Sequence, residues 1–204
     1  MQDGFYRVAA ASPKVTVADP HANARAMAQL IRRAAGEGAG AICFPELSLT
    51  GATCGDLFRS RTLLQGAEAA LAQLMADTAD LDILCVVGVP VPRGGSLTDA
   101  VAVFHRGELL GLSTKTCLSS ASGLSQGRHF TPGPQPYEAL TFAGQETVLG
   151  PRLLFECENV EGLTLGAVPG EDLWASSSAG GLTAAGATVL LHPTAAPELA
   201  GRAA

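Results

Sequence analysis

The stretch Phe44–Phe58, FPELSLTGATCGDLF, contains the features around which the rest of the chain is organised. The apolar run Ala41–Phe44 predicts a buried strand, and the proline after it ends that strand because proline has no backbone N–H. Glu46 then stands at the exit of the strand beside apolar walls. Such a position raises the pKa of a carboxyl group toward the range of a general base. Asp56 is expected to cap a helix that begins at Leu57.

The composition indicates a folded domain with an acidic balance. The chain has 204 residues, 47% of them hydrophobic and 16% charged, which is enough for one domain with a sizeable core. A net charge of −6 and the absence of a basic stripe argue against nucleic acid as a partner. The sequence contains neither an apolar stretch of membrane-helix length nor a signal-type segment at its start. We therefore expect a cytoplasmic protein with no membrane partner.

The cysteines and histidines do not indicate a disulfide framework or a metal centre. The five cysteines lack CxxC spacing, and the four histidines are scattered along the chain. Cysteines of this kind are most simply small buried hydrophobic residues in a reducing compartment. We expect no metal site and no cofactor.

The periodicity of the chain predicts strands that alternate first with helices and then with hairpin turns. The expected strands are Tyr6–Ala11, Ala41–Phe44, Ile83–Val89, Ala100–Phe104, Glu108–Ser113, Arg152–Glu156, Leu163–Val168 and Thr188–Leu191. The expected helices are Ala22–Ala35, after Asp19 as N-cap, and Leu57–Ala79, with a small-residue helix after Ala179. Ala100–Phe104 is expected to form a hairpin with Glu108–Ser113, and Arg152–Glu156 with Leu163–Val168. This order predicts a layered α/β domain.

The motifs FPELSLTG and TCGDLF resemble the glutaminase domain of the glutamine-dependent NAD synthetases, a branch of the nitrilase (carbon–nitrogen hydrolase) superfamily. The resemblance implies a nitrilase-like αββα sandwich and a Glu-Lys-Cys triad in which Glu46 is the general base. Lys115, in GLSTKTCL, matches the lysine that stabilises negative charge on the substrate's carbonyl oxygen. From the residues alone, a carboxylate such as Glu46 is more often an ordinary loop residue, and a lone lysine at a strand end, such as Lys115, is usually a solvated edge residue.

The segment that should contain the nucleophile departs from the family pattern. GAVPGEDLW, Gly166–Trp174, resembles the family's GVEICEDLW, and this alignment puts the nucleophilic cysteine on Gly170, which has no side chain. A second glutamate that supports the lysine in the family is also missing, with Gly123 or Gln126 in its place. Ala52 stands where the family has a tyrosine. The serines at 176–178 are a conceivable substitute nucleophile, but we expect them to solvate a helix start.

The end of the chain, HPTAAPELAGR, resembles the family's NLSASPELAGR. The resemblance implies that Thr194 and Arg202, together with Glu171, contribute to a glutamine site. A complete domain of this family has further strands and is followed by a synthetase domain. Residues 1–204 are therefore expected to form one partial glutaminase domain, C-terminally incomplete and without a synthetase domain. Its last strand, Thr188–Leu191, should leave an uncovered apolar edge and favour self-association.

Two functional interpretations remain open. The family reaction is hydrolysis of the glutamine amide, which supplies ammonia, but loss of the nucleophile from such a unit costs on the order of a millionfold in rate. The chain is then a glutaminase-type domain that is catalytically dead or strongly impaired. Alternatively, it is a non-catalytic module of the nitrilase fold that binds a partner. Glutamine or another small amide is the expected ligand if a pocket survives.

Overall fold

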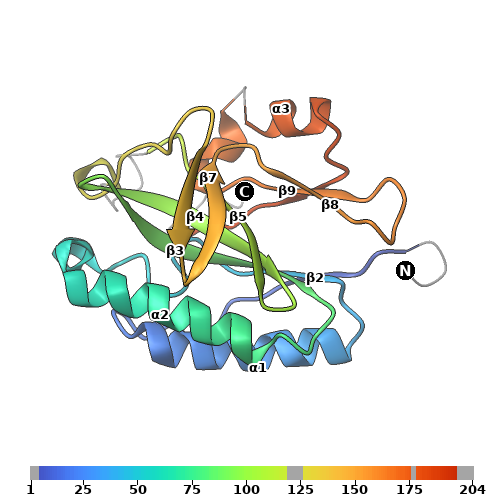
Figure 1. Cartoon of the computed structure of the whole chain (residues 1–204), viewed down its shortest axis with the longest axis horizontal. Helices are drawn as coiled ribbons and strands as arrows, with labels where there is room; N and C mark the ends of the chain where they lie inside the picture. The colour runs from blue at the N-terminus through green and yellow to red at the C-terminus, as the bar shows by residue number, and fades with distance from the viewer. Residues whose placement is uncertain (1–4, 119–125, 176–177, 197–204) are drawn as a thin grey trace, which may run out of the picture.

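A computed structural model describes residues 5–118, 126–175 and 178–196, which form two sheets packed face to face between helices (Figure 1). The larger sheet has seven strands in the order β1-β2-β3-β4-β5-β7-β6, and the smaller has three in the order β10-β9-β8. The strands of the larger sheet are β1 Val8–Ala10, β2 Ala41–Cys43, β3 Leu84–Arg93, β4 Ser96–His105, β5 Glu108–Thr114, β6 Glu138–Phe142 and β7 Gln145–Gly150. Those of the smaller sheet are β8 Leu154–Glu156, β9 Thr164–Ala167 and β10 Val189–Leu191.

The first helix, α1 (Pro20–Gly36), begins where the sequence predicts. The carboxylate of Asp19 accepts a hydrogen bond from the backbone N–H of Ala22 at 3.0 Å, and proline occupies the first helical position. Met27 and Ile31 lie one turn apart on the same face and are fully buried. This face packs against the larger sheet, so the predicted helix is confirmed.

The long helix predicted over Leu57–Ala79 is wrong, because two elements occupy this stretch. A short 3-10 helix, η1 (Gly55–Arg59), is followed by α2 (Arg61–Asp77), and between them Ser60 is extended with φ −78° and ψ 118°. A serine at this N-cap position favours a helix start, which the Ala- and Leu-rich composition conceals. The predicted cap at Asp56 is also wrong, since this residue lies inside η1 and its carboxylate pairs with Arg128 at 3.0 Å.

The larger sheet is buried on both faces. Val87 and Ala102 belong to the core cluster that includes α1 and α2, whereas Val86 and Val101 pack with Leu165 of the smaller sheet. Because both faces are covered, the central strands are continuous apolar runs without polar alternation. The predicted hairpin β4–β5 is confirmed, while the hairpin β6–β7 was not predicted from the sequence.

The smaller sheet completes the αββα sandwich. The predicted hairpin β8–β9 is confirmed, and β10 runs parallel to β9 at the edge. A short helix, α3 (Ala179–Ala184), covers the outer face of the smaller sheet. Its Leu182 side chain lies over Gly166 of β9, where an added Cβ atom would be 3.2 Å away. Figure 1 shows α3 on one side of the two sheets and α1 with α2 on the other. Self-association through the β10 edge stays a prediction. No helix in the described ranges has both the length and the apolar character needed to cross a membrane.

Candidate active site

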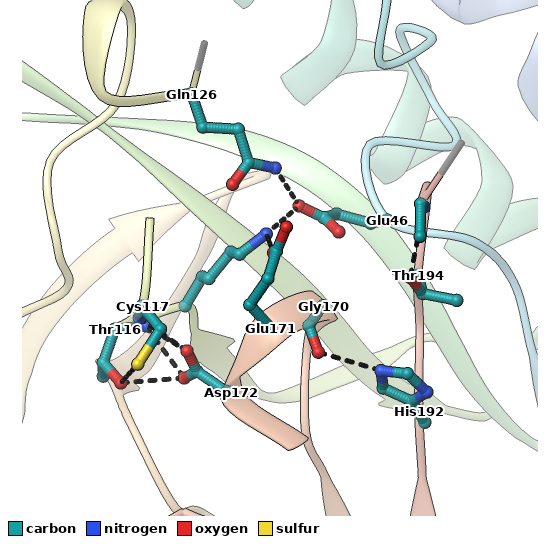
Figure 2. Close-up of polar contacts among 11 residues, drawn as sticks. Glu46, Thr116, Cys117, Gln126, Gly170, Glu171, Asp172, His192 and Thr194 are labelled. Carbon is teal, nitrogen blue, oxygen red and sulfur yellow. Dashed lines mark hydrogen bonds and ion pairs between the residues drawn. The ribbon is translucent and has the colours of Figure 1, made fainter. Parts of the chain in front are cut away.

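Glu46 and Lys115 converge in the interior between the two sheets. Glu46 follows β2 and Lys115 follows β5. The ammonium Nζ of Lys115 donates a hydrogen bond to Oε1 of Glu46 at 2.6 Å, and the side chains of Lys115 and Glu46 are 0% and 2% exposed. Figure 2 shows the Glu46 carboxylate between Gln126 and Gly170. The structure thus brings together the two residues that the resemblance assigns to the triad. Neither is the solvated surface group that a lone glutamate or lysine usually is.

The loop that holds Glu46 lies directly on β3. A Cβ atom added at Gly88 would lie 2.1 Å from the backbone nitrogen of Leu47 and 2.5 Å from the carbonyl oxygen of Pro45. The hydroxyl of Ser48 accepts a hydrogen bond from the Gly88 N–H at 3.1 Å. Only a glycine on β3 permits this close approach, which fixes where the Glu46 carboxylate stands.

Position 170 faces this ion pair from the smaller sheet. Gly170 begins a short 3-10 helix, η3 (Gly170–Trp174), that follows β9. A Cβ atom added at Gly170 would lie 2.4 Å from Nζ of Lys115 and 2.7 Å from Oε2 of Glu46. The backbone there has φ +49°, which favours glycine. The lysine ammonium therefore fills the space in which a side chain at position 170 would begin.

Two further side chains, those of Gln126 and Glu171, contact the Glu46–Lys115 pair. Gln126 donates from Nε2 to Oε1 of Glu46 at 2.7 Å, and Glu171 forms an ion pair with Lys115. Of the two residues predicted to replace the missing second glutamate, Gln126 therefore reaches the site, while Gly123 lies outside the described residues. Glu171 contacts the predicted lysine, and its role in substrate binding stays a prediction.

The electrostatics of the pair favour the charged form of both residues. Burial opposes the charge on Glu46, but hydrogen bonds and the Lys115 ammonium outweigh it, and the pKa of Glu46 is lowered. Burial likewise opposes the charge on Lys115, but the carboxylates of Glu46 and Glu171 outweigh it, and the pKa of Lys115 is raised. Glu46 is therefore a hydrogen-bonded carboxylate and a weak base.

Two buried acids at this site were not predicted from the motifs. Asp172, in η3, is 2% exposed and accepts hydrogen bonds from Thr116 N at 2.8 Å, Thr116 Oγ1 at 2.9 Å and Cys117 N at 2.5 Å. This carboxylate ties the smaller sheet to the segment that follows Lys115. The second acid, Asp99 on β4, is fully buried. A charged residue inside an apolar strand was the available signal for Asp99.

The remaining predicted site residues are less informative. Thr194 is exposed, and its hydroxyl accepts a hydrogen bond from the Ala196 N–H at 3.2 Å. Arg202 lies outside the described residues, as do two of the three serines considered as substitute nucleophiles. The roles of Thr194 and Arg202 in a glutamine site stay predictions.

The thiols of Cys43, Cys85 and Cys117 are held in their protonated form. Burial raises the pKa of Cys43 and of Cys85 to about 12. Burial and the Asp172 carboxylate raise the pKa of Cys117, which stands two residues after Lys115. A protonated thiol is a poor nucleophile. Within the described ranges, no three side chains among His, Cys, Asp and Glu are arranged to hold a metal ion.

A cavity of about 270 Å3 lies next to Gln126, the residue that donates to Glu46. It is lined by Leu47, Ala52, Thr53, Gly55, Phe58, Gln126, His129 and Phe130. Ala52, which stands where the family has a tyrosine, lines this cavity. Its lining combines aromatic and small side chains with Gln126, which also donates a hydrogen bond to Glu46.

Comparison with known proteins places the sequence among characterised relatives. The carbon–nitrogen hydrolase family profile matches residues 7–190. The glutamine-dependent NAD(+) synthetase of Mycobacterium tuberculosis (strain H37Rv) is 33% identical over 203 residues, which are 99% of this chain and 30% of that protein. The corresponding protein of Aquifex aeolicus is 38% identical over 95 residues, 47% of this chain and 17% of that one. The chain thus spans less than a third of the length of these relatives.

Solved structures support the same fold. A glutamine-dependent NAD(+) synthetase from Cytophaga hutchinsonii superposes with a TM-score of 0.83 at 24% identity, covering 97% of this chain and 32% of that one. An amidase from Nesterenkonia sp. superposes with a TM-score of 0.69 at 22% identity, covering 95% of this chain and 66% of that one. The nitrilase-like αββα fold inferred from the sequence is therefore confirmed.

Proposed function

The chain belongs to the carbon–nitrogen hydrolase family, and from that membership we propose that it is a glutaminase-type domain that has lost amide hydrolysis. The observation that carries the proposal is the geometry at Gly170. The backbone of this residue faces the Glu46–Lys115 pair, and a Cβ atom there would lie 2.4 Å from Nζ of Lys115. The position expected for the nucleophile is therefore occupied by a lysine ammonium, and the residue itself has nothing with which to attack.

The chemistry of the intact reaction explains why this loss is decisive. A cysteine thiolate would attack the carbonyl carbon of a primary amide, with a glutamate accepting the thiol proton and a lysine stabilising the oxyanion. Ammonia would leave and water would hydrolyse the resulting thioester. Glu46 and Lys115 can supply only proton transfer and charge stabilisation. Without the nucleophile, the rate is expected to fall on the order of a millionfold.

The surroundings of the pair also support a loss of activity. Oε1 of Glu46 already accepts hydrogen bonds from Lys115 and Gln126. Lys115 is neutralised by Glu46 and Glu171 together, so its positive charge is not free to meet a developing oxyanion. Glu46 and Lys115 are thus paired with each other and with their neighbours Gln126 and Glu171. In this ion network the two residues have a structural role.

A second candidate function is the binding of a small amide without hydrolysis. It is favoured by the cavity of about 270 Å3 beside Gln126, which is close to the lower end of the volumes of about 300–1,000 Å3 that are typical of ligand pockets. In such a complex, the amide of glutamine or a similar compound would occupy the cavity, and no bond would be broken. Isothermal titration calorimetry with glutamine and with acetamide would measure this binding.

The test of the main proposal is an assay for ammonia released from glutamine by the purified chain. We expect no release above the blank, since an ordinary enzyme turns over about 10 times per second and a millionfold loss removes a measurable signal. The matched control is Glu46→Gln, because ammonia that persists in this variant comes from a contaminating amidase. Turnover of about 0.1 per second or more that is abolished by Glu46→Gln would overturn the proposal.

Gly170→Cys tests the same proposal from the opposite direction. The new side chain would enter the space of the Lys115 ammonium, and the backbone at φ +49° disfavours any residue with a Cβ. We therefore expect at most weak amidase activity, several orders of magnitude below about 10 per second. Full activity in this variant would show that the ion network opens readily and that only the thiol is missing.

A further inference from the structure

Asp99 is a buried carboxyl group whose charge state needs an explanation. The residue lies on β4 and is 0% exposed. Neither of its carboxyl oxygens has a hydrogen-bond donor among the described residues. An ionised carboxylate in such a place would cost several kcal/mol, and buried polar groups almost always have partners.

The position of Asp99 brings it against the Glu46–Lys115 pair. The carbonyl oxygen of Asp99 accepts a hydrogen bond from the N–H of Lys115 at 2.9 Å, directly beyond the last pair of the β4–β5 ladder, Ala100 with Thr114. Residues opposite one another on neighbouring strands direct their side chains to the same face of a sheet. The Asp99 carboxyl therefore faces the same interior space as the Lys115 side chain.

Three charged groups from three elements meet at the Lys115 ammonium, on the face of the sheet that the Asp99 carboxyl shares. They are Glu46 from the loop after β2, Lys115 from the end of β5, and Glu171 from η3. Two carboxylates and one ammonium have a net charge of −1, so a further negative charge on Asp99 would be repelled by two anions and attracted by a single cation. A proton on Asp99 removes this repulsion and supplies the donor that its neighbour Glu46 can accept.

We propose that Asp99 is a further residue of this site, a neutral carboxylic acid at physiological pH that donates a hydrogen bond to the Glu46 carboxylate. It is a positioning residue, because it acts on Glu46 and touches no reacting atom. Burial first, and then the charge and hydrogen bond of Glu46, raise the pKa of Asp99 well above its usual range. The same contact is the largest of the effects that lower the pKa of Glu46.

The hydrogen-bonding capacity of Glu46 fits this assignment. A carboxylate has about four lone-pair sites. Lys115 and Gln126 occupy two of them on Oε1, and the Asp99 O–H would be a third donor to the same group. The role goes beyond the proposed loss of hydrolysis, since it concerns how the carboxylate is held and would apply whatever residue stood at position 170. Its tests need no catalytic activity.

Asp99→Asn is the decisive variant, because asparagine has the same shape, is neutral and retains an N–H donor for Glu46. Wild-type Asp99 keeps its proton in the folded state and releases it in the unfolded state above pH ~4. The stabilisation that the Asp99 carboxyl contributes is therefore fully present below the pKa of this group in the unfolded state. It is lost as the pH rises through the pKa of the group in the folded state. Relative to Asp99→Asn, the unfolding equilibrium constant of the wild type should rise by about tenfold per pH unit over that window.

Urea denaturation of both proteins at pH 5, 6, 7 and 8 measures this difference, and Asp80→Asn is the matched control. Asp80 is an exposed aspartate paired with Arg32, so its loss should leave the pH dependence unchanged. If the ratio of the unfolding equilibrium constants of the wild type and Asp99→Asn does not change with pH, the proposal is overturned. An Asp99→Asn variant at least tenfold less stable than the wild type at pH 7 would do the same, since it would show that the anion is required.

A spectroscopic measurement tests the proton directly. In protein labelled with 13C at the aspartate carboxyl carbons, one resonance should keep the shift of a protonated acid at pH 6 and be absent from Asp99→Asn. In Glu46→Gln, the repulsion from Glu46 is gone, so this resonance should titrate at lower pH than in the wild type. If all wild-type aspartates are ionised at pH 6, or if Glu46→Gln leaves the Asp99 titration unchanged, the assignment is wrong.

Discussion

The two sheets contribute unequal halves to one site. The larger sheet supplies Glu46 and Lys115, two buried charged side chains joined at 2.6 Å. The smaller sheet supplies Gly170, a backbone position with φ +49° and no side chain, together with the partly exposed Glu171. The half that carries the charge is held by several buried contacts, and the half that should carry the nucleophile presents a bare backbone.

The difference follows from what each residue does for the fold. Removing one partner of a buried ion pair leaves an uncompensated charge and costs about 3–5 kcal/mol, which is a large share of the stability of a domain. A nucleophile makes no such contribution, and at position 170 a glycine suits the backbone better than a residue with a Cβ. Losing one member of the charged pair therefore destabilises the fold whether or not the site is catalytic, whereas a change at the glycine position carries no such penalty.

Lys115→Met breaks the charged half and should have the largest effect. Methionine has a similar length but no charge, so Glu46 loses its cation in a site from which water is excluded. We expect a loss of about 3–5 kcal/mol in the free energy of unfolding at pH 7, measured by urea denaturation. The folded-state pKa of Glu46 would be raised in the variant, so the loss should shrink as the pH falls below that pKa.

The control for Lys115→Met is the double variant Glu46→Gln, Lys115→Met. It removes both charges at once, and replacing a buried pair by uncharged groups of similar volume is often close to neutral. At least about half of the lost free energy should return. A single variant that loses less than about 1 kcal/mol would mean that the pair contributes no more than a surface ion pair.

The fold was predictable where burial imposes a simple pattern. β3 and β4 are covered on both faces, and their continuous apolar runs identified them. The break at Ser60 was not predictable from periodicity, because the Ala- and Leu-rich composition of the stretch as a whole favours one continuous helix. Propensity measures local preference, and a single extended residue between two helical segments is a small local signal.

The site was predictable where a motif named it and was missed where only three-dimensional packing creates it. FPE, the lysine after the second hairpin strand and GEDLW located Glu46, Lys115 and Gly170. Asp99 and Asp172 carry no motif of their own, and their importance depends on which strands are neighbours. A single carboxylate in an apolar run signals burial, but its partners become visible only in the folded structure.

Asp172→Asn sharpens the comparison by weakening the link between the two halves. The Asp172 carboxylate accepts from two backbone N–H groups and from the Thr116 hydroxyl, which fixes the segment after Lys115 against η3. An asparagine side chain has one acceptor oxygen and turns an N–H group toward donors. We expect a loss of about 2 kcal/mol in urea denaturation, because buried donors are left without partners. Thr116→Val removes the hydroxyl donor alone and should cost about 1 kcal/mol, so equal losses in the two variants would contradict the assigned role of the carboxylate.

Glu171→Gln tests the charged group of the smaller sheet and should have the smallest effect. Its side chain is 30% exposed, so water screens the attraction to Lys115, which keeps Glu46 as its buried partner. We expect a loss of about 0.5–1 kcal/mol at pH 7. Because the pKa of Lys115 is raised in the folded protein, the contribution of this pair is present below the pKa of the lysine in the unfolded state and is lost as the pH rises through its pKa in the folded state.

The matched control is Glu138→Gln, which removes a partly exposed pair with Arg93 on the larger sheet and should lose a similar free energy. A loss at Glu171 as large as that of Lys115→Met would show that the smaller sheet holds the lysine as firmly as the larger one does, and the two halves would then not differ in the way described.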